Sequence, residues 1–231
     1  SGAAGIEDAI ALGLSDELWA GVESIWETEV THTFVTEMAD GFLDRERFHV
    51  YFDQDYPFLR DWTTPLNLAT AKAPDFGAAR GIVRFLHLGL GGEEGLFQEA
   101  FRKRGISRKA VAGLQYLPTT QNYSGYLRTL AYEGTFTKFV ATLLAVEWPY
   151  QDWAQRAEET GRRPSGRYYQ TWIDIHTSPD MSRFVSWLRS LVDESAPTAV
   201  QQNRLQEIFR DVLRYEYQFF EIAYRGESWP Q

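Results

Sequence analysis

The chain has 231 residues, of which 44% are hydrophobic and 24% charged, which is enough apolar surface for the core of one ordinary domain. Its 23 Lys and Arg against 32 Asp and Glu give a net charge of −9, with one basic cluster at 101–109, so we expect no binding to nucleic acid. The absence of cysteine excludes disulfides, thiolate metal sites and a cysteine nucleophile.

Apolar runs are also too short for a membrane span, so no membrane partner is expected. The first residues lack the basic start of a signal peptide. A cytoplasmic protein is therefore the default. Residues 1–14 are expected to form a flexible N-terminal segment.

Helical periodicity dominates the sequence, and no run alternates like a strand. Ser15 and Asp44 are placed to cap helices, and the "DG" at Asp40-Gly41 should end the first one. The glycine-rich "GLGG" at 89–92 should bend the third helix. The predicted helices cover residues 15–39, 44–73, 74–104, 107–114, 118–134, 135–159, 167–177, 182–194 and 198–224. With no repeat or long linker, the chain is predicted to be a single-domain all-α bundle over residues 1–231.

Three acids interrupt stripes that should face the core. Asp55, Glu147 and Glu216 each have mostly aromatic or aliphatic residues three and four positions away, on the same helix face. Burying an uncompensated carboxylate costs several kcal/mol. Each acid alone could lie at the edge of its stripe or pair with an arginine. Together, they indicate an acidic pocket with aromatic walls, where pKa values suit general acid–base chemistry.

Two prolines lie close to these acids. Pro57 and Pro149 would each free the carbonyl four residues earlier, which either curves the helix or widens it where a ligand enters. His176 follows Trp172 by four positions, so it should lie near the core. It is either a hydrogen-bonded structural group or a pocket residue.

Five segments carry a resemblance to a known family. They are "FHVYFDQDYPFLRDW", "LPTTQNYSGYL", "LLAVEWPYQDW", "YYQTWIDIHTSPDM" and "LRYEYQFFEIAYRGESWP". In order and spacing these resemble the TenA/thiaminase II family, from about Trp19 to Trp229. The resemblance implies a haem-oxygenase-like fold and a cofactor-free, metal-free hydrolase of aminopyrimidines related to thiamin. It also implies a small-molecule pyrimidine as ligand and an oligomer, either a homodimer or a homotetramer.

The resemblance also implies roles for individual residues. Asp55 would hold the ring nitrogen and exocyclic amine of the pyrimidine, and Glu216 would be the central acid–base group. Tyr123 and Tyr150 would hydrogen-bond near the reacting carbon, while Phe219 would stack on the ring. Phe58 stands where the family often has tyrosine. His176 lies where the cysteine-containing branch tends to have tyrosine.

One departure affects the chemistry. The better-known branch has a nucleophilic cysteine where this chain has Val146, which is followed by Glu147. A valine cannot attack a ring, so the covalent route is closed. The glutamate and the acidic pair Glu93 and Glu94 resemble the cysteine-less branch called TenA-E. That branch is associated with hydrolysis of aminopyrimidine or its N-formyl derivative to 4-amino-5-hydroxymethyl-2-methylpyrimidine. Glu94 is included among the expected substrate-binding residues.

Two alternatives remain at this stage. Di-iron oxidases of the same fold would use Glu147, His176 and Asp180, but too few further ligands are present. A non-catalytic pyrimidine binder or regulator is the other, although no basic face supports direct binding to DNA. The preferred hypothesis is a hydrolase in which Glu216 and Glu147 activate water while Asp55 orients the pyrimidine.

Overall fold

The computed structural model describes residues 12–230, and their regular structure is helical, as predicted. Most of the N-terminal segment expected to be flexible lies outside the described residues. Between residues 12 and 230, no helix is both long and apolar enough to cross a membrane. The elements are α1 (Leu14–Ala20), α2 (Glu23–Val30), α3 (Thr33–Asp40), α4 (Arg45–Lys72), α5 (Phe76–Leu88), the π-helix η1 (Gly89–Glu93), α6 (Glu94–Lys103), α7 (Arg108–Ala112), α8 (Pro118–Glu133), α9 (Phe136–Glu159), α10 (Arg167–Thr177), α11 (Pro179–Asp193) and α12 (Ala199–Arg225).

Capping side chains begin the long helices where the sequence predicts. The Asp44 carboxylate accepts a hydrogen bond from the backbone N–H of Glu46 at the start of α4. The Thr135 hydroxyl accepts one from Lys138 N–H in the same way at α9. Thr198 and Gln201 form a reciprocal capping box at α12, which satisfies two backbone donors at once.

The single helix predicted for residues 15–39 is wrong, because three short helices occupy this stretch. Gly13 and not Ser15 is the N-cap of α1, and Gly21 ends that helix. His32 begins α3, since its Nδ1 accepts a hydrogen bond from the Phe34 N–H at 3.0 Å. The other ring nitrogen of His32 lies 2.8 Å from the Glu221 carboxylate of α12, so a tertiary contact holds the interruption in place.

The start of α11 differs from the prediction, and the expected bend has a specific form. Helix α11 begins at Pro179, three residues early, because the Ser178 hydroxyl caps it and proline is favourable in a first helical turn. The expected bend at 89–92 is the π-helix η1, which joins α5 to α6. Helices α4 and α9 continue through Pro57 and Pro149.

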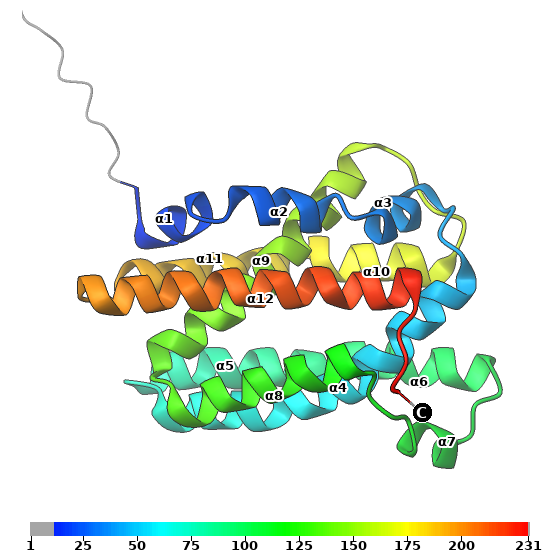
Figure 1. Cartoon of the computed structure of the whole chain (residues 1–231), viewed down its shortest axis with the longest axis horizontal. Coiled ribbons are helices and arrows are strands. Elements are labelled where there is room, and N and C mark those ends of the chain that lie inside the picture. Colours follow the sequence, from blue (N-terminus) through cyan, green and yellow to red (C-terminus); the bar gives the residue numbers. More distant parts are fainter. Residues whose placement is uncertain (1–11, 231) are drawn as a thin grey trace, which may run out of the picture.

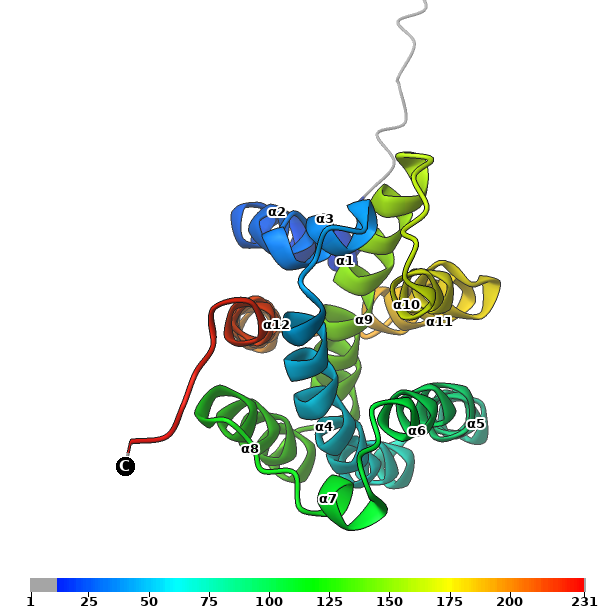
Figure 2. The same ribbon diagram turned by 90° about the vertical axis from the view of Figure 1, so that its right-hand side faces the viewer.

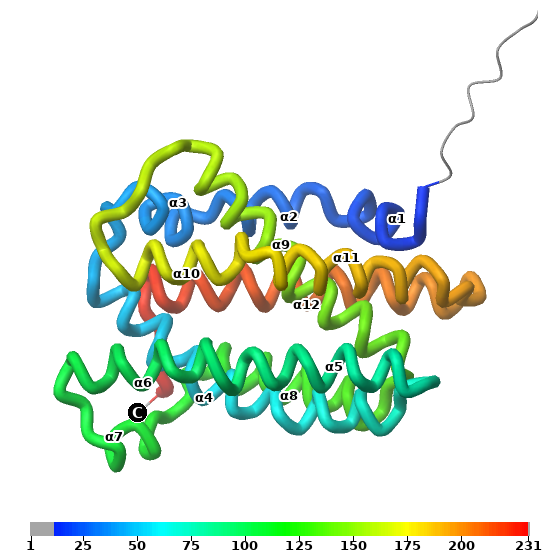
Figure 3. The backbone as a smooth tube through the Cα atoms, turned by 180° about the vertical axis from the view of Figure 1, so that it is seen from behind, coloured from blue at the N-terminus to red at the C-terminus, as the bar shows by residue number. Residues whose placement is uncertain are grey.

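The helices form two groups joined by α4 and α9. In Figure 1, α1–α3 and α10–α12 lie in the upper half, and α5, α6 and α8 lie in the lower half. Seen from the end, α4 and α9 form a central column, with α12 and α8 on one side and α10, α11, α5 and α6 on the other (Figure 2). Figure 3 shows the row formed by α10 and α11 above the row formed by α5 and α6.

Helix α9 forms the centre of the core because it contacts other helices on nearly every side. All eight residues from Phe139 to Val146 are buried, a run that an ordinary amphipathic surface helix would not show. This helix packs against α10, α11 and α12. Its next residue, Glu147, is the first charged group after that run, so the fold brings a carboxylate into the middle of the bundle.

Candidate functional site

A cavity of about 930 Å³ is lined by residues of the central column, α4 and α9, and of the rows α5–α6 and α10–α11. Helix α12 supplies a further part of its wall. The volume is near the upper end of the range of about 300–1,000 Å³ that is typical of small-molecule sites. Apolar side chains make up most of the lining, and a few polar groups converge inside it.

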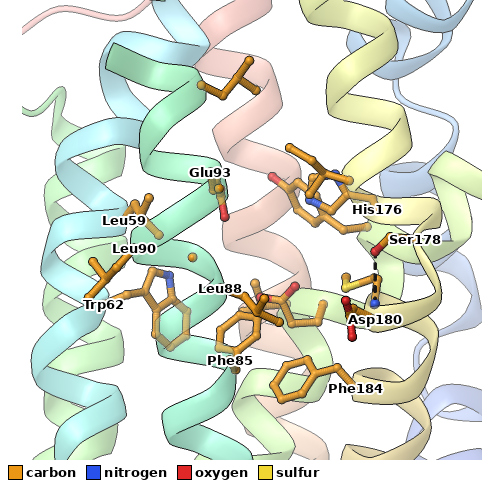
Figure 4. A pocket seen from close by; sticks show the side chains of 18 of the residues that line it. Leu59, Trp62, Phe85, Leu88, Leu90, Glu93, His176, Ser178, Asp180 and Phe184 are labelled. Carbon is orange, nitrogen blue, oxygen red and sulfur yellow. Dashed lines mark hydrogen bonds between the residues drawn. The ribbon is translucent and has the colours of Figure 1, made fainter. Parts of the chain in front are cut away.

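Three predicted acids line this one cavity, and each comes from a different long helix. Asp55 is supplied by α4, Glu147 by α9 and Glu216 by α12. Glu93, the last residue of η1, adds a fourth carboxyl group (Figure 4). The apolar stripes predicted around the three acids therefore do face a common interior, with the carboxyl groups turned to the cavity.

The four carboxyl groups share the same electrostatic situation. Burial raises the pKa of Glu216 and of Glu93 to about 7 in each case. Burial, followed by repulsion from Glu93 and Glu216, raises the pKa of Glu147 well above its ordinary value. The pKa of Asp55 is raised in the same way, by burial first and then by its three acidic neighbours. Near neutral pH, this group therefore contains both protonated and ionised carboxyls.

Tyrosine hydroxyls surround Glu216, which is only 3% exposed. The Tyr123 hydroxyl donates a hydrogen bond to Glu216 Oε1. This bond and the Tyr150 hydroxyl both lower the pKa of Glu216 and so oppose part of the effect of burial. The hydroxyl of Tyr150 lies 2.8 Å from that of Tyr51, and both tyrosines line the cavity. Glu216 is thus held in a defined orientation with one hydrogen-bond donor fixed behind it.

His176 lines the cavity from α10 as a neutral imidazole. Its Nδ1 is 2.7 Å from the carbonyl oxygen of Trp172, so Nδ1 carries the proton and donates to that carbonyl. Burial lowers the pKa of His176 to about 4. The ring therefore offers Nε2 as a hydrogen-bond acceptor and adds no positive charge. Both alternatives left by the sequence hold together, because His176 is hydrogen-bonded within its helix and also lines the pocket.

Aromatic rings form a wall beside the acids. Phe58 and Phe219 both line the cavity, and their ring centroids are 5.5 Å apart. Val146 lines it next to Glu147, so both residues of this pair face the same space. A flat ring bound here would contact apolar faces and carboxyl groups together.

Two expected substrate-binding residues lie elsewhere. Glu94 does not line the cavity, because its Oε1 accepts a hydrogen bond from Gln98 at 2.9 Å and is 3.4 Å from the Tyr56 hydroxyl. The neighbouring residue Glu93 lines the cavity, as was expected of Glu94. Tyr123 is fully buried behind Glu216 and contacts this acid, not the cavity.

Among the lining residues that the predicted site left out, Tyr51 and Glu93 lie with the acids and had a signal in the sequence. Tyr51 precedes Asp55 by four positions, so helical spacing alone placed it on the same face. Glu93 precedes the buried Phe97 by four positions, which is the equivalent signal on the next helix.

This arrangement can bind a nitrogen heterocycle and transfer protons. Carboxyl groups accept from or donate to ring nitrogens and amines, and a mixed set of protonation states supplies an acid and a base side by side. Within residues 12–230, no three or more His, Asp or Glu side chains are grouped in a way that could hold a metal ion.

Comparison with known proteins gives a consistent result. The sequence model of the TENA/THI-4/PQQC family matches residues 19–226. An aminopyrimidine aminohydrolase of Halalkalibacterium halodurans is 26% identical over 220 residues, covering 94% of this chain and 98% of the relative. One of Bacillus subtilis is 26% identical over 217 residues, covering 93% of this chain and 91% of the relative.

Solved structures extend the comparison to the fold. A TenA homologue from P. horikoshii superposes with a TM-score of 0.84 at 22% identity, covering 93% of this chain and 100% of that chain. Haem oxygenase-1 from the cyanobacterium Synechocystis superposes with a TM-score of 0.62 at 12% identity, covering 91% of each chain. The chain therefore has the haem-oxygenase-like fold and belongs to the TENA/THI-4/PQQC family.

Proposed function

We propose that this protein hydrolyses aminopyrimidines related to thiamin and releases the hydroxymethylpyrimidine for salvage. The observation that carries the proposal is the meeting of Asp55, Glu147 and Glu216 in one cavity beside the Phe58 and Phe219 rings. Its relatives of H. halodurans and B. subtilis, both named aminopyrimidine aminohydrolase, support this substrate class. Like the cysteine-less branch that it resembles, the chain would use water and no covalent nucleophile.

Substrate binding would rest on complementary hydrogen bonds. The Asp55 carboxyl faces the cavity. In its protonated form, which the raised pKa favours, it would donate to the ring nitrogen of an aminopyrimidine and accept from the exocyclic amine. The ring would lie against Phe219 and Phe58, which line the same space. Tyr150 and the neutral His176 add a hydroxyl and a nitrogen acceptor on another side of the cavity.

The proposed reaction divides proton transfer between two glutamates. An ionised carboxylate of the pair Glu147 and Glu216 removes a proton from water, whose oxygen bonds to the methylene carbon beside the ring. The carbon–nitrogen bond breaks, and the protonated member of the pair gives its proton to the departing amine. The raised pKa values of both acids support this division, because neighbouring carboxyls that repel each other do not ionise together.

Incubation of the metal-free protein with thiamin, aminomethylpyrimidine and its N-formyl derivative tests the proposal. We expect release of hydroxymethylpyrimidine from at least one of the two aminomethylpyrimidines. Release from none of the three compounds would refute the enzyme assignment.

A non-catalytic pyrimidine binder is the second candidate. The observation that favours it is Val146, which faces the cavity where the better-known branch has its nucleophile. A rise in melting temperature with hydroxymethylpyrimidine, without turnover of any substrate, would identify a binder.

The homodimer or homotetramer expected from the resemblance is a separate prediction, which a solution mass measurement tests.

A further inference from the structure

The cavity is longer than one pyrimidine ring requires. Asp55, Trp62 and Leu66 all line it from α4, and Leu66 is eleven positions beyond Asp55. At a rise of about 1.5 Å per residue, the cavity extends about 16 Å along this helix. A ring held by Asp55 therefore leaves most of the cavity free.

The free part has a different chemistry from the acidic part. We call it the apolar half, formed by Leu59, Trp62, Phe85, Leu88, Leu90 and Phe184, all of which line the cavity. Phe85 of α5 and Phe184 of α11 stack with their ring centroids 4.2 Å apart and their planes 4° from parallel. Figure 4 shows these two rings side by side, below Glu93 and His176. A flat or branched apolar group would replace water against such walls.

The charges around the cavity disfavour an anionic occupant. Seven acidic residues line it, against two arginines. Both arginines, Arg84 and Arg183, bind the same oxygen of Asp180, at 3.0 and 2.7 Å. Among residues 12–230, each arginine that lines the cavity is therefore paired with a carboxylate. A phosphate in the apolar half would face apolar side chains without gaining an uncommitted cation.

We propose that the substrate carries an uncharged aromatic or branched apolar group on the nitrogen that leaves, and that the apolar half binds this group. The inference rests on the proposed function for the position of the ring at Asp55. The methylene and its nitrogen then lie between the two halves of the cavity. When the carbon–nitrogen bond breaks, the amine takes up one proton and departs with its apolar substituent. A phosphorylated substituent should gain no affinity from the apolar half.

Binding of compounds that cannot be hydrolysed tests this proposal. The aminopyrimidine is prepared with an ethyl, a phenylpropyl, a phosphonopropyl or an aminopropyl chain in place of the aminomethyl group, and calorimetry gives each dissociation constant. We expect the phenylpropyl compound to bind about tenfold or more tightly than the ethyl compound, because its ring is transferred from water to an apolar wall. The phosphonopropyl compound should bind no more tightly than the ethyl compound.

Variants assign the gain to the apolar half. Phe85→Ala removes one ring of a partly exposed stacked pair and should reduce the phenylpropyl advantage by about fivefold or more, while the ethyl compound keeps its affinity. Phe184→Ala should do the same from α11. Phe76→Ala is the matched control, because Phe76 is on α5, is 85% exposed and does not line the cavity.

The outcomes separate this inference from the proposed function. Equal affinity for the ethyl and phenylpropyl compounds would refute the inference and leave the proposed function intact. Tighter binding of the phosphonopropyl or aminopropyl compound than of the phenylpropyl compound would also refute it. Failure of every compound to bind would refute both.

Discussion

Two buried glutamates on neighbouring helices have opposite surroundings. Glu216 of α12 is 3% exposed, lines the cavity and accepts a hydrogen bond from Tyr123. Glu29 of α2 is 0% exposed, and neither of its carboxyl oxygens has a hydrogen-bond partner among residues 12–230. Burial raises the pKa of both. Only Glu216 can meet a ligand, so an unusual pKa alone does not identify a functional residue.

Replacement of Glu216 should have the largest effect. Glu216→Gln keeps the size of the side chain but removes proton transfer, and we expect kcat to fall by about 10²–10⁴-fold with pyrimidine binding retained. Steady-state kinetics and calorimetry measure the two quantities. Glu207→Gln, at an exposed position on the same helix, is the control. Unchanged activity of the Glu216 variant would remove this residue from the mechanism.

Replacement of Glu29 should change stability and leave activity within about twofold. The pKa of Glu29 is raised well above 4.5 by burial, then by repulsion from Glu216 and Asp152. Above about pH 4.5, Glu29 is ionised in the unfolded chain but still protonated in the folded protein. The free energy of unfolding therefore falls as the pH rises above this value. Glu29→Gln removes this penalty.

The size of the effect depends on pH. The free energy of unfolding of the Glu29→Gln variant should exceed that of the unsubstituted protein by about 1–3 kcal/mol more at about pH 8 than at about pH 4. Urea unfolding at both pH values measures it. Glu23→Gln, an exposed acid at the start of the same helix, should show no such difference. A gain independent of pH would contradict the account.

Loss of the hydroxyl behind Glu216 should move the pH profile. Tyr123→Phe deletes the hydrogen bond that lowers the pKa of Glu216, so this pKa should rise above about 7. If Glu216 acts as the base, the acidic limb of the kcat profile shifts to higher pH. Turnover measured across the pH range tests this shift. A profile that scales down without moving would show that Tyr123 has only a structural role.

The pair Glu93 and Glu94 gives the smallest and most local comparison. Glu93→Gln removes a cavity carboxyl that raises the pKa of Asp55 and Glu147, so both pKa values should fall. We expect kcat/KM to change by about tenfold. Glu94→Gln alters only contacts to Gln98 and Tyr56, so kcat/KM should change by less than about twofold. Equal effects would show that the assignment of Glu93 to the cavity is wrong.

The sequence predicts most of the fold because local signals mark most of the helices. The cap at Asp44, the helix starts near Thr135 and Thr198, and the helix α10 (Arg167–Thr177) all lie at their predicted positions. The N-terminal break at His32 could not be predicted, since it depends on a contact with Glu221, which is 189 residues away along the chain.

Residues of the site could be predicted only where their helical spacing from apolar residues indicates that they are buried. Asp55, Glu147 and Glu216 lie within apolar stripes, so their common cavity follows from helix geometry once the helices pack. The assignment of Glu94 failed because spacing does not show that Gln98 and Tyr56 hold its carboxylate outside the cavity. The apolar half depends on α5 and α11 meeting at Phe85 and Phe184, a tertiary contact that has no signal in either segment.

A single turnover in water labelled with heavy oxygen tests the central claim most directly. If a carboxylate activates water for direct attack, the hydroxymethylpyrimidine released in the first turnover carries the label. Unlabelled product, with the label later found in Glu147 or Glu216 by mass spectrometry of the digested protein, would contradict the account. That result would make one of these glutamates a covalent nucleophile.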